Sequence, residues 1–155
     1  MVKLSCHRAP STPLALQRGI TMIEVLVSIV VISLGLLGFA GLQAVSIKAN
    51  NTAYQRGMAT VFAYDIIDRM RANRPSAING SYNFALGAGG CAANLVGTDI
   101  CEFLTDVGNG LPGGIAGVTV AGDGFSTIVI QWTGQDDLNG DGIPDPVKFT
   151  TQTKI

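Results

Sequence analysis

The sequence predicts an α+β protein in which one long N-terminal helix packs against a small antiparallel β-sheet. Two observations predict the helix. Residues 25–47 form an uncharged apolar run, and apolar residues then recur every three or four positions as far as residue 70. A third observation predicts the sheet, because apolar and polar residues alternate in three short segments between residues 117 and 151. The 155 residues are enough for this long helix and one small head domain.

The apolar run is long enough to cross a membrane. Its 23 uncharged residues would form about 35 Å of helix, whereas a hydrocarbon core is about 30 Å thick. Glu24 stands at the head of this run. A carboxylate costs roughly 2.5 to 3.5 kcal/mol at the centre of a bilayer and less near its surface, so Glu24 should have a cationic partner. Cleavage between Gly19 and Ile20 would create one, because the new amine would lie one helical turn from Glu24 or within reach from a neighbouring copy.

Residues 18–27, which read Arg-Gly-Ile-Thr-Met-Ile-Glu-Val-Leu-Val, resemble the N-terminus of type IV prepilins. The shared pattern is a basic leader that ends in Gly, then an apolar residue, Thr, two more apolar residues, Glu and a long apolar helix. The resemblance implies cleavage by a prepilin peptidase after Gly19 and N-methylation of Ile20. It also implies a pilin-like fold and assembly into a filament through the apolar helix, with Glu24 as the assembly residue.

Two plainer interpretations of the same residues stay open. The segment would also serve as an ordinary single-pass anchor or as an uncleaved signal sequence, with Glu24 near the bilayer surface. A secretory signal peptide fits less well. Its cleavage site follows the apolar region, whereas the candidate cut after Gly19 precedes it.

Charge predicts the orientation of the anchor. The leader, residues 1–19, has three basic residues and no acidic one, so the positive-inside bias should keep it in the cytoplasm. Removing those three from the 10 basic residues leaves 7 against 11 acidic residues, a formal charge of −4. No basic stripe is evident beyond Arg69, Arg71 and Arg74, so nucleic acid is not a predicted partner.

The predicted organisation has three parts: the leader at 1–19, a transmembrane and assembly helix at 20–48, and a periplasmic head at 49–155. In the head the amphipathic helix continues over 49–73. It should stop there because Pro75 disfavours helical geometry in the residue before it and cannot donate a hydrogen bond.

Residues 76–114 are rich in Gly, Ala, Asn and Ser, which predicts an irregular connecting region. Of the three cysteines, Cys6 lies in the leader, which leaves Cys91 and Cys101 to form a disulfide in an oxidising compartment. Closing such a short loop would stabilise the head by roughly 2.5 to 3 kcal/mol through loop-closure entropy. Two free thiols are the alternative.

The sheet is predicted over 115–155. Its three alternating segments lie at 117–120, 125–132 and 147–151, and Ile128, Ile130 and Trp132 share one face. We expect this apolar face to pack on the helix. The contact side expected there is formed by Met58, Phe62 and Ile66.

Residues 137–145 read Asp-Leu-Asn-Gly-Asp-Gly-Ile-Pro-Asp, which fits the first half of an EF-hand-type calcium loop. A turn at Gly142 would let oxygen ligands at alternate positions converge on a cation. The twelfth position is Lys148 instead of a bidentate Glu, so the helix-loop-helix form is excluded. The predicted ligands are Asp137, Asn139, Asp141, the Ile143 carbonyl and Asp145. A hairpin rich in Gly and Asp, without metal, explains the same residues.

The residues needed for an enzyme are missing from the predicted mature chain. The only histidine, His7, lies in the leader, so no histidine remains to activate a Ser or Cys nucleophile. The Gly-rich stretch 87–90 lacks the Lys and the Ser or Thr of a phosphate-binding loop. We expect no enzymatic activity and no cofactor beyond the calcium considered above.

Residues 33–43, 51–56 and 63–73 resemble the PilV family of type IV pilus modification proteins, which are minor pilins. The resemblance covers about the first half of the mature chain. It implies a low-abundance subunit of the fimbrium that primes pilus assembly and supports adhesion or motility. The implied partners are other minor pilins, the major pilin, the prepilin peptidase, the inner-membrane assembly platform and membrane lipid. A pseudopilin of a type II secretion system and an adhesive pilus-tip subunit remain alternatives.

Overall fold

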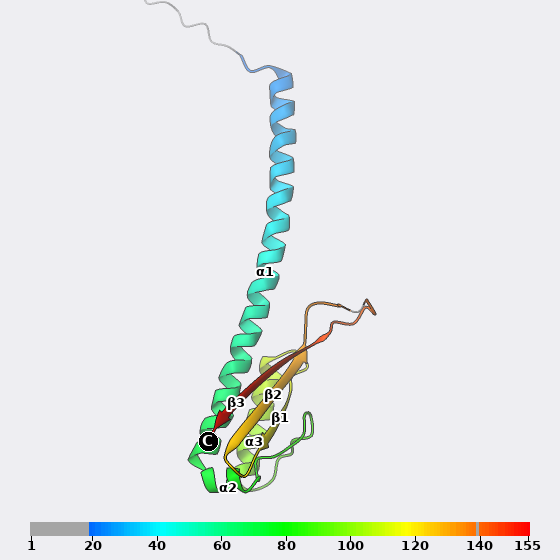
Figure 1. Ribbon diagram of the computed structural model, residues 1–155. Coiled ribbons are helices and arrows are strands. Elements are labelled where there is room, and N and C mark those ends of the chain that lie inside the picture. The colour runs from blue at the N-terminus through cyan, green and yellow to red at the C-terminus, as the bar shows by residue number, and fades with distance from the viewer. Residues whose placement is uncertain (1–18, 139) are drawn as a thin grey trace, which may run out of the picture. The chain divides into compact units, whose positions relative to one another are not determined.

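The computed structural model of this protein describes residues 19–138 and 140–155, and the chain divides into two compact units (Figure 1). We call Met1–Leu42 the N-terminal unit and Gln43–Ile155 the head. The elements, in chain order, are α1 (Met22–Ala72), α2 (Arg74–Ile78), α3 (Leu95–Gly110), β1 (Ile115–Val120), β2 (Phe125–Thr133) and β3 (Pro146–Lys154). Helix α1 begins in the N-terminal unit and ends in the head.

The described part of the N-terminal unit has no buried residue. Among the described residues, α1 is the one helix long and apolar enough to cross a membrane, and its most apolar stretch has a mean hydropathy of 2.6. Two of its serine side chains bond within the helix. The hydroxyls of Ser28 and Ser33 each donate to the carbonyl four residues earlier, at 2.6 Å in both cases. The outer surface of this segment is therefore almost entirely apolar.

The sheet has the order β1-β2-β3, and both strand pairs are antiparallel. Buried and more exposed positions alternate along β2, and Ile128, Ile130 and Trp132 lie on the buried face. The predicted alternation is confirmed. The strands are longer than the segments that predicted them, because further residues at their ends also pair in register.

The head core lies where α1, α3 and the inner face of the sheet meet. The residues that α1 buries are Gln55, Ala59, Ala63, Ile66, Ile67 and Met70. Two of these are alanines, whose small side chains let the helix backbone come close to its neighbours. The one amide among them is satisfied, because the indole N–H of Trp132 donates to Oε1 of Gln55 at 3.0 Å. The predicted packing of the helix on the sheet is confirmed.

The predicted contact side of α1 has a neighbour that the sequence did not predict. Ile66 is buried, but Met58 and Phe62 are only partly buried and lie beside Gly110, at the end of α3. A Cβ atom at Gly110 would come within 2.5 Å of Phe62. This side of α1 therefore also meets α3, a helix that the sequence did not predict.

The prediction that residues 76–114 are irregular is wrong. Helix α1 stops before Pro75 as expected, but α2 restarts at once with this proline in its first turn, where its missing N–H is no loss. Helix α3 then occupies sixteen residues of the same region. It buries Ile100, Phe103 and Val107 at helical spacing, and this packing outweighs the low helix propensity of its glycines.

Candidate functional site

The N-terminal motif lies at the start of α1. Gly19, Ile20 and Thr21 precede the helix, and the Thr21 carbonyl accepts hydrogen bonds from the N–H groups of Glu24 at 3.0 Å and Val25 at 3.3 Å. The peptide bond after Gly19 is thus outside the regular helix, and Ile20 is 76% exposed. The predicted cleavage site therefore lies in non-helical backbone next to an exposed side chain.

Glu24 and Ile20 are brought together. They line the same shallow hollow, with Gly19 and Thr21 as its other lining residues. A charged amine created at Ile20 would therefore form beside the carboxylate in the first turn of the helix. An anionic side chain also suits the first turn, where the unpaired backbone N–H groups carry partial positive charge. The basic residues predicted to hold the leader in the cytoplasm, Lys3, Arg8 and Arg18, lie outside the described residues.

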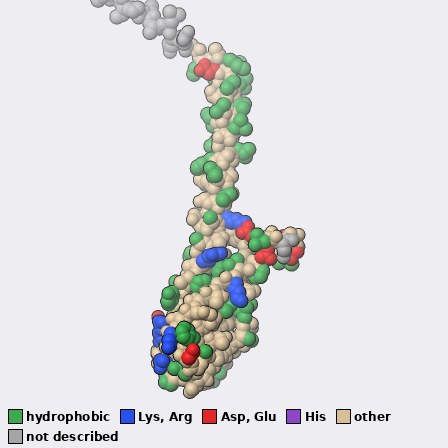
Figure 2. All heavy atoms as spheres, viewed as in Figure 1, with side chains coloured by type: hydrophobic (Ala, Val, Ile, Leu, Met, Phe, Trp, Pro, Cys, Tyr) green, Lys and Arg blue, Asp and Glu red, His purple; other side chains and the backbone are tan. Residues whose placement is uncertain are grey.

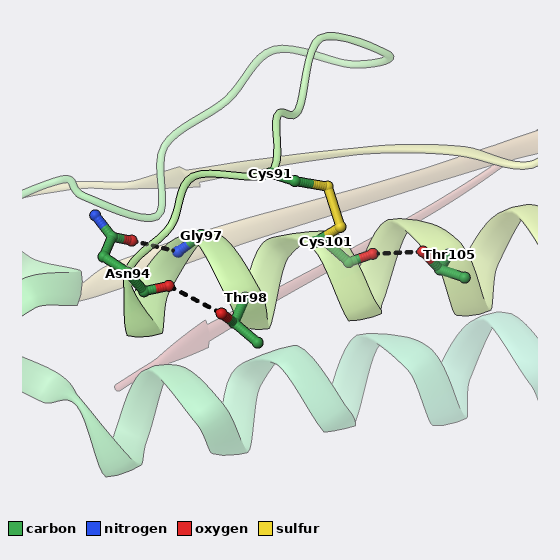
Figure 3. The surroundings of a disulfide bond; sticks show 6 residues. All are labelled: Cys91, Asn94, Gly97, Thr98, Cys101 and Thr105. Carbon is green, nitrogen blue, oxygen red and sulfur yellow. Dashed lines mark hydrogen bonds between the residues drawn. A yellow bond between two sulfur atoms is a disulfide. The ribbon is translucent and has the colours of Figure 1, made fainter.

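The disulfide joins Cys91 to Cys101, as the sequence predicts (Figure 3). It ties the loop that precedes α3 to the second turn of that helix. Asn94 caps the helix N-terminus, with its side chain accepting from the N–H of Gly97 at 2.7 Å. A Cβ atom at position 97 would collide with the backbone of Ala92, so glycine is needed where the loop crosses the helix start.

Polar contacts also join α1 to α3 within the head. Arg69 donates to Asp65 on its own helix at 2.8 Å and to Glu102 of α3 at 2.6 Å, and it pairs with Asp99 at 3.4 Å. The hydroxyl of Tyr82 donates to Asp99 at 2.6 Å. The hydrogen bond to Glu102 raises the pKa of Arg69 further above its ordinary value, although burial opposes this. Burial, and then the bond to Asp99, raise the pKa of Tyr82 to about 12.

The loop between β2 and β3 is organised by its own carboxylates. The side chain of Asp137 accepts from the N–H groups of Gly140 at 2.6 Å, Asp141 at 3.2 Å and Gly142 at 2.7 Å. Both glycines have positive φ, of 78° and 83°, which is the conformation that a tight turn requires of them. The N–H of Leu138 donates to Asp145 at 2.6 Å.

The calcium prediction stays a prediction. Among the residues that the structure describes, no three Asp, Glu, His or Cys side chains form a group able to hold a metal ion. The predicted ligand Asn139 lies outside the described residues. Asp137 and Asp141 are close in the loop, but both accept backbone hydrogen bonds that a bound cation would have to share or replace.

Sequence reasoning missed Gln55, Tyr82, Asp99 and Glu102. Each has its partner in a distant element, and helical spacing carries no signal for such a pair. The signal for Asp99 and Glu102 was present as two acidic residues three apart within α3. That spacing could not be interpreted, because the sequence did not predict the helix that contains both residues.

The fold and the N-terminal geometry define a class of protein: an apolar helix that continues into a small α+β head, with an acidic residue at the entrance of the apolar stretch. Residues 14–40 match the family model described as the prokaryotic N-terminal methylation motif. No curated protein and no solved structure gives a significant match to the chain.

The matched residues include Gly19, Ile20 and Glu24. The chain therefore carries the N-terminal methylation motif typical of type IV pilins and pseudopilins, and its fold is pilin-like. Proteins of this class are structural and not enzymatic. The match ends at residue 40 and does not distinguish the PilV family from other proteins with the motif.

Proposed function

We propose that this protein is a minor pilin of a type IV pilus. In this proposal a prepilin peptidase cuts after Gly19, the new N-terminus at Ile20 is methylated, and the subunit enters or primes the filament. The observation that carries the proposal is the match of residues 14–40 to the methylation motif, with Gly19, Ile20 and Glu24 at the start of an exposed apolar helix.

The mechanism follows from where the charges stand. Before assembly, α1 anchors the protein in the inner membrane with the leader in the cytoplasm and the head in the periplasm. After cleavage the amine of Ile20 neutralises a carboxylate, either Glu24 of the same chain or that of a neighbour, which lowers the cost of keeping Glu24 in an apolar environment. The apolar surface of α1 then exchanges lipid for the helices of other subunits.

The resemblance of residues 33–43, 51–56 and 63–73 to the PilV family supports the role of a minor pilin over that of a major subunit. The partners would be other minor pilins, the major pilin, the peptidase and the inner-membrane assembly platform. A pseudopilin of a type II secretion system is the second candidate, because the matched motif is common to both kinds of protein.

Cleavage tests the proposal directly. In cells that contain prepilin peptidase, mass spectrometry should find a mature protein that begins at Ile20, whereas Gly19→Val should accumulate as the uncut precursor. Gly41→Val, a matched change within α1, should be processed normally, because a Cβ atom there meets nothing within 4 Å. A wild-type protein that keeps its leader, or is cut after the apolar run, would overturn the assignment.

A further inference from the structure

The loop between β2 and β3 carries two large apolar side chains that the head leaves exposed. Leu138 is 84% exposed and Ile143 is 66% exposed. Figure 2 shows apolar and acidic side chains gathered on this loop, which stands out from the body of the head. Single exposed apolar residues are common on protein surfaces, so exposure alone decides nothing. Any function of Leu138 and Ile143 depends on where their loop lies in the head.

The base of the loop is fastened to a defined point on α1. Asp136 forms an ion pair with Lys48, and the two residues line a common groove with Val45, Ala49 and other residues of the helix. Lys48 is the first charged residue after the apolar run of residues 25–47. The base of the loop therefore lies beside the end of the apolar run.

A helix that crosses a membrane places the first charge after its apolar run at the bilayer surface, because the ammonium group stays in water while its stem lies along the lipid. Asp136 must then lie at the same level. Leu138 and Ile143 follow it by two and seven residues, within reach of the headgroup layer.

We propose that this loop rests on the membrane and inserts Leu138 and Ile143 between zwitterionic lipid headgroups. The inference depends on the proposed anchoring of α1 in the bilayer. The choice of lipid follows from charge. The loop contains the acidic residues Asp136, Asp137, Asp141 and Asp145. These carboxylates repel anionic lipids and attract the ammonium groups of zwitterionic ones. Such a contact would hold the head against the membrane until the subunit is extracted into a filament.

Tryptophan quenching in the full chain tests the contact. The only native tryptophan, Trp132, is buried in the head and provides a constant baseline. In phosphatidylcholine nanodiscs, bromine on the acyl chains should quench the added emission of Leu138→Trp at least twofold. Ile143→Trp should respond in the same way. The matched control is Leu95→Trp at the start of α3, a leucine that is 66% exposed and should not be quenched.

Two readouts separate the possible failures. Copurification of the wild-type chain with nanodiscs reports the anchoring of α1, and its absence would overturn both the anchoring and the inference that depends on it. If the chain copurifies while Leu138→Trp and Ile143→Trp are no more quenched than Leu95→Trp, the loop does not touch lipid. In that case only the inference is wrong. An intact disulfide and an unchanged melting temperature check that each variant is folded.

Discussion

Glu24 is an acidic residue in the first turn of a helix whose next 23 residues are uncharged. Glu24→Val should leave the protein inserted in the membrane, because it removes a charge that is costly to bury. The variant should nevertheless fail to enter filaments, since the amine of Ile20 would lose its partner. Immunoblots of sheared pili measure incorporation. Ser28→Ala, one turn further along and bonded only within the helix, is the matched control and should assemble normally. Normal incorporation of Glu24→Val would remove Glu24 from the mechanism.

Tyr82 should make the head less stable as the pH rises into the alkaline range. Its pKa is about 12 in the fold and about 10 in an unfolded chain, so the unfolded state loses the proton first. The contribution of Tyr82 to the free energy of unfolding is fully present below pH 10. It is lost as the pH rises toward 12, and the loss is up to roughly 2 to 3 kcal/mol.

Denaturant unfolding of the head at several pH values between 9 and 12 would measure this loss. Tyr82→Phe should be less stable at neutral pH, because Asp99 loses a hydrogen bond, and its stability should fall less steeply in the alkaline range. A parallel decline of the two proteins would show that another group is responsible.

Which residue contacts could be predicted depended on their distance in the sequence. The pairs Asp65–Arg69 and Asp68–Arg71 follow from helical spacing, and both are present, at 2.8 Å and 3.1 Å. The additional bond from Arg69 to Glu102 was not predictable, because it requires knowing that α3 exists and where it packs.

At the scale of elements, local periodicity identified α1 and all three strands but not α3. The apolar residues of α3 have helical spacing, yet its composition is diluted by three glycines. Two features that sequence propensity does not weigh form this helix: the cap at Asn94 and the burial of Phe103 and its neighbours. The disulfide was predictable because only compartment and cysteine count were needed.

The loop after β2 provides a test at the same scale. If it binds calcium, the melting temperature of the head, Gln43–Ile155, should rise with calcium and fall with chelator. The gain would be about 2.7 kcal/mol at 100 times the dissociation constant. Asp137→Ala combined with Asp141→Ala should abolish the response, while Asp106→Ala, on the exposed side of α3, should keep it. Equal melting of the wild-type head in millimolar calcium and in chelator would leave the loop as a metal-free turn.

At the scale of the whole molecule, the α+β class and the anchor were predictable because each rests on a pattern within one segment. The packing was not, since it joins segments far apart in the chain. Trp132 of β2 bonds to Gln55 of α1, and Ile155 closes the core near Gly124. Nothing in the spacing of these residues indicates that they meet.

A pilus role and a secretion role predict different defects in a cell that lacks the gene. Deleting the gene should reduce surface pili and pilus-dependent motility several-fold and leave exoprotein secretion intact, and a plasmid copy should restore both pilus traits. A copy that carries Gly19→Val should restore neither. Loss of secretion with normal piliation would instead assign the protein to a type II secretion system.

Helix α1 belongs to both units, and this has a mechanical consequence. Six of its residues are buried in the head core, and the same helix backbone continues into the apolar segment. Tension applied to that segment would therefore be passed to the head through α1, the helix that carries these six buried residues. The Cys91–Cys101 bond limits how far the loop before α3 could extend under such a load, so the head should resist pulling best in its oxidised form.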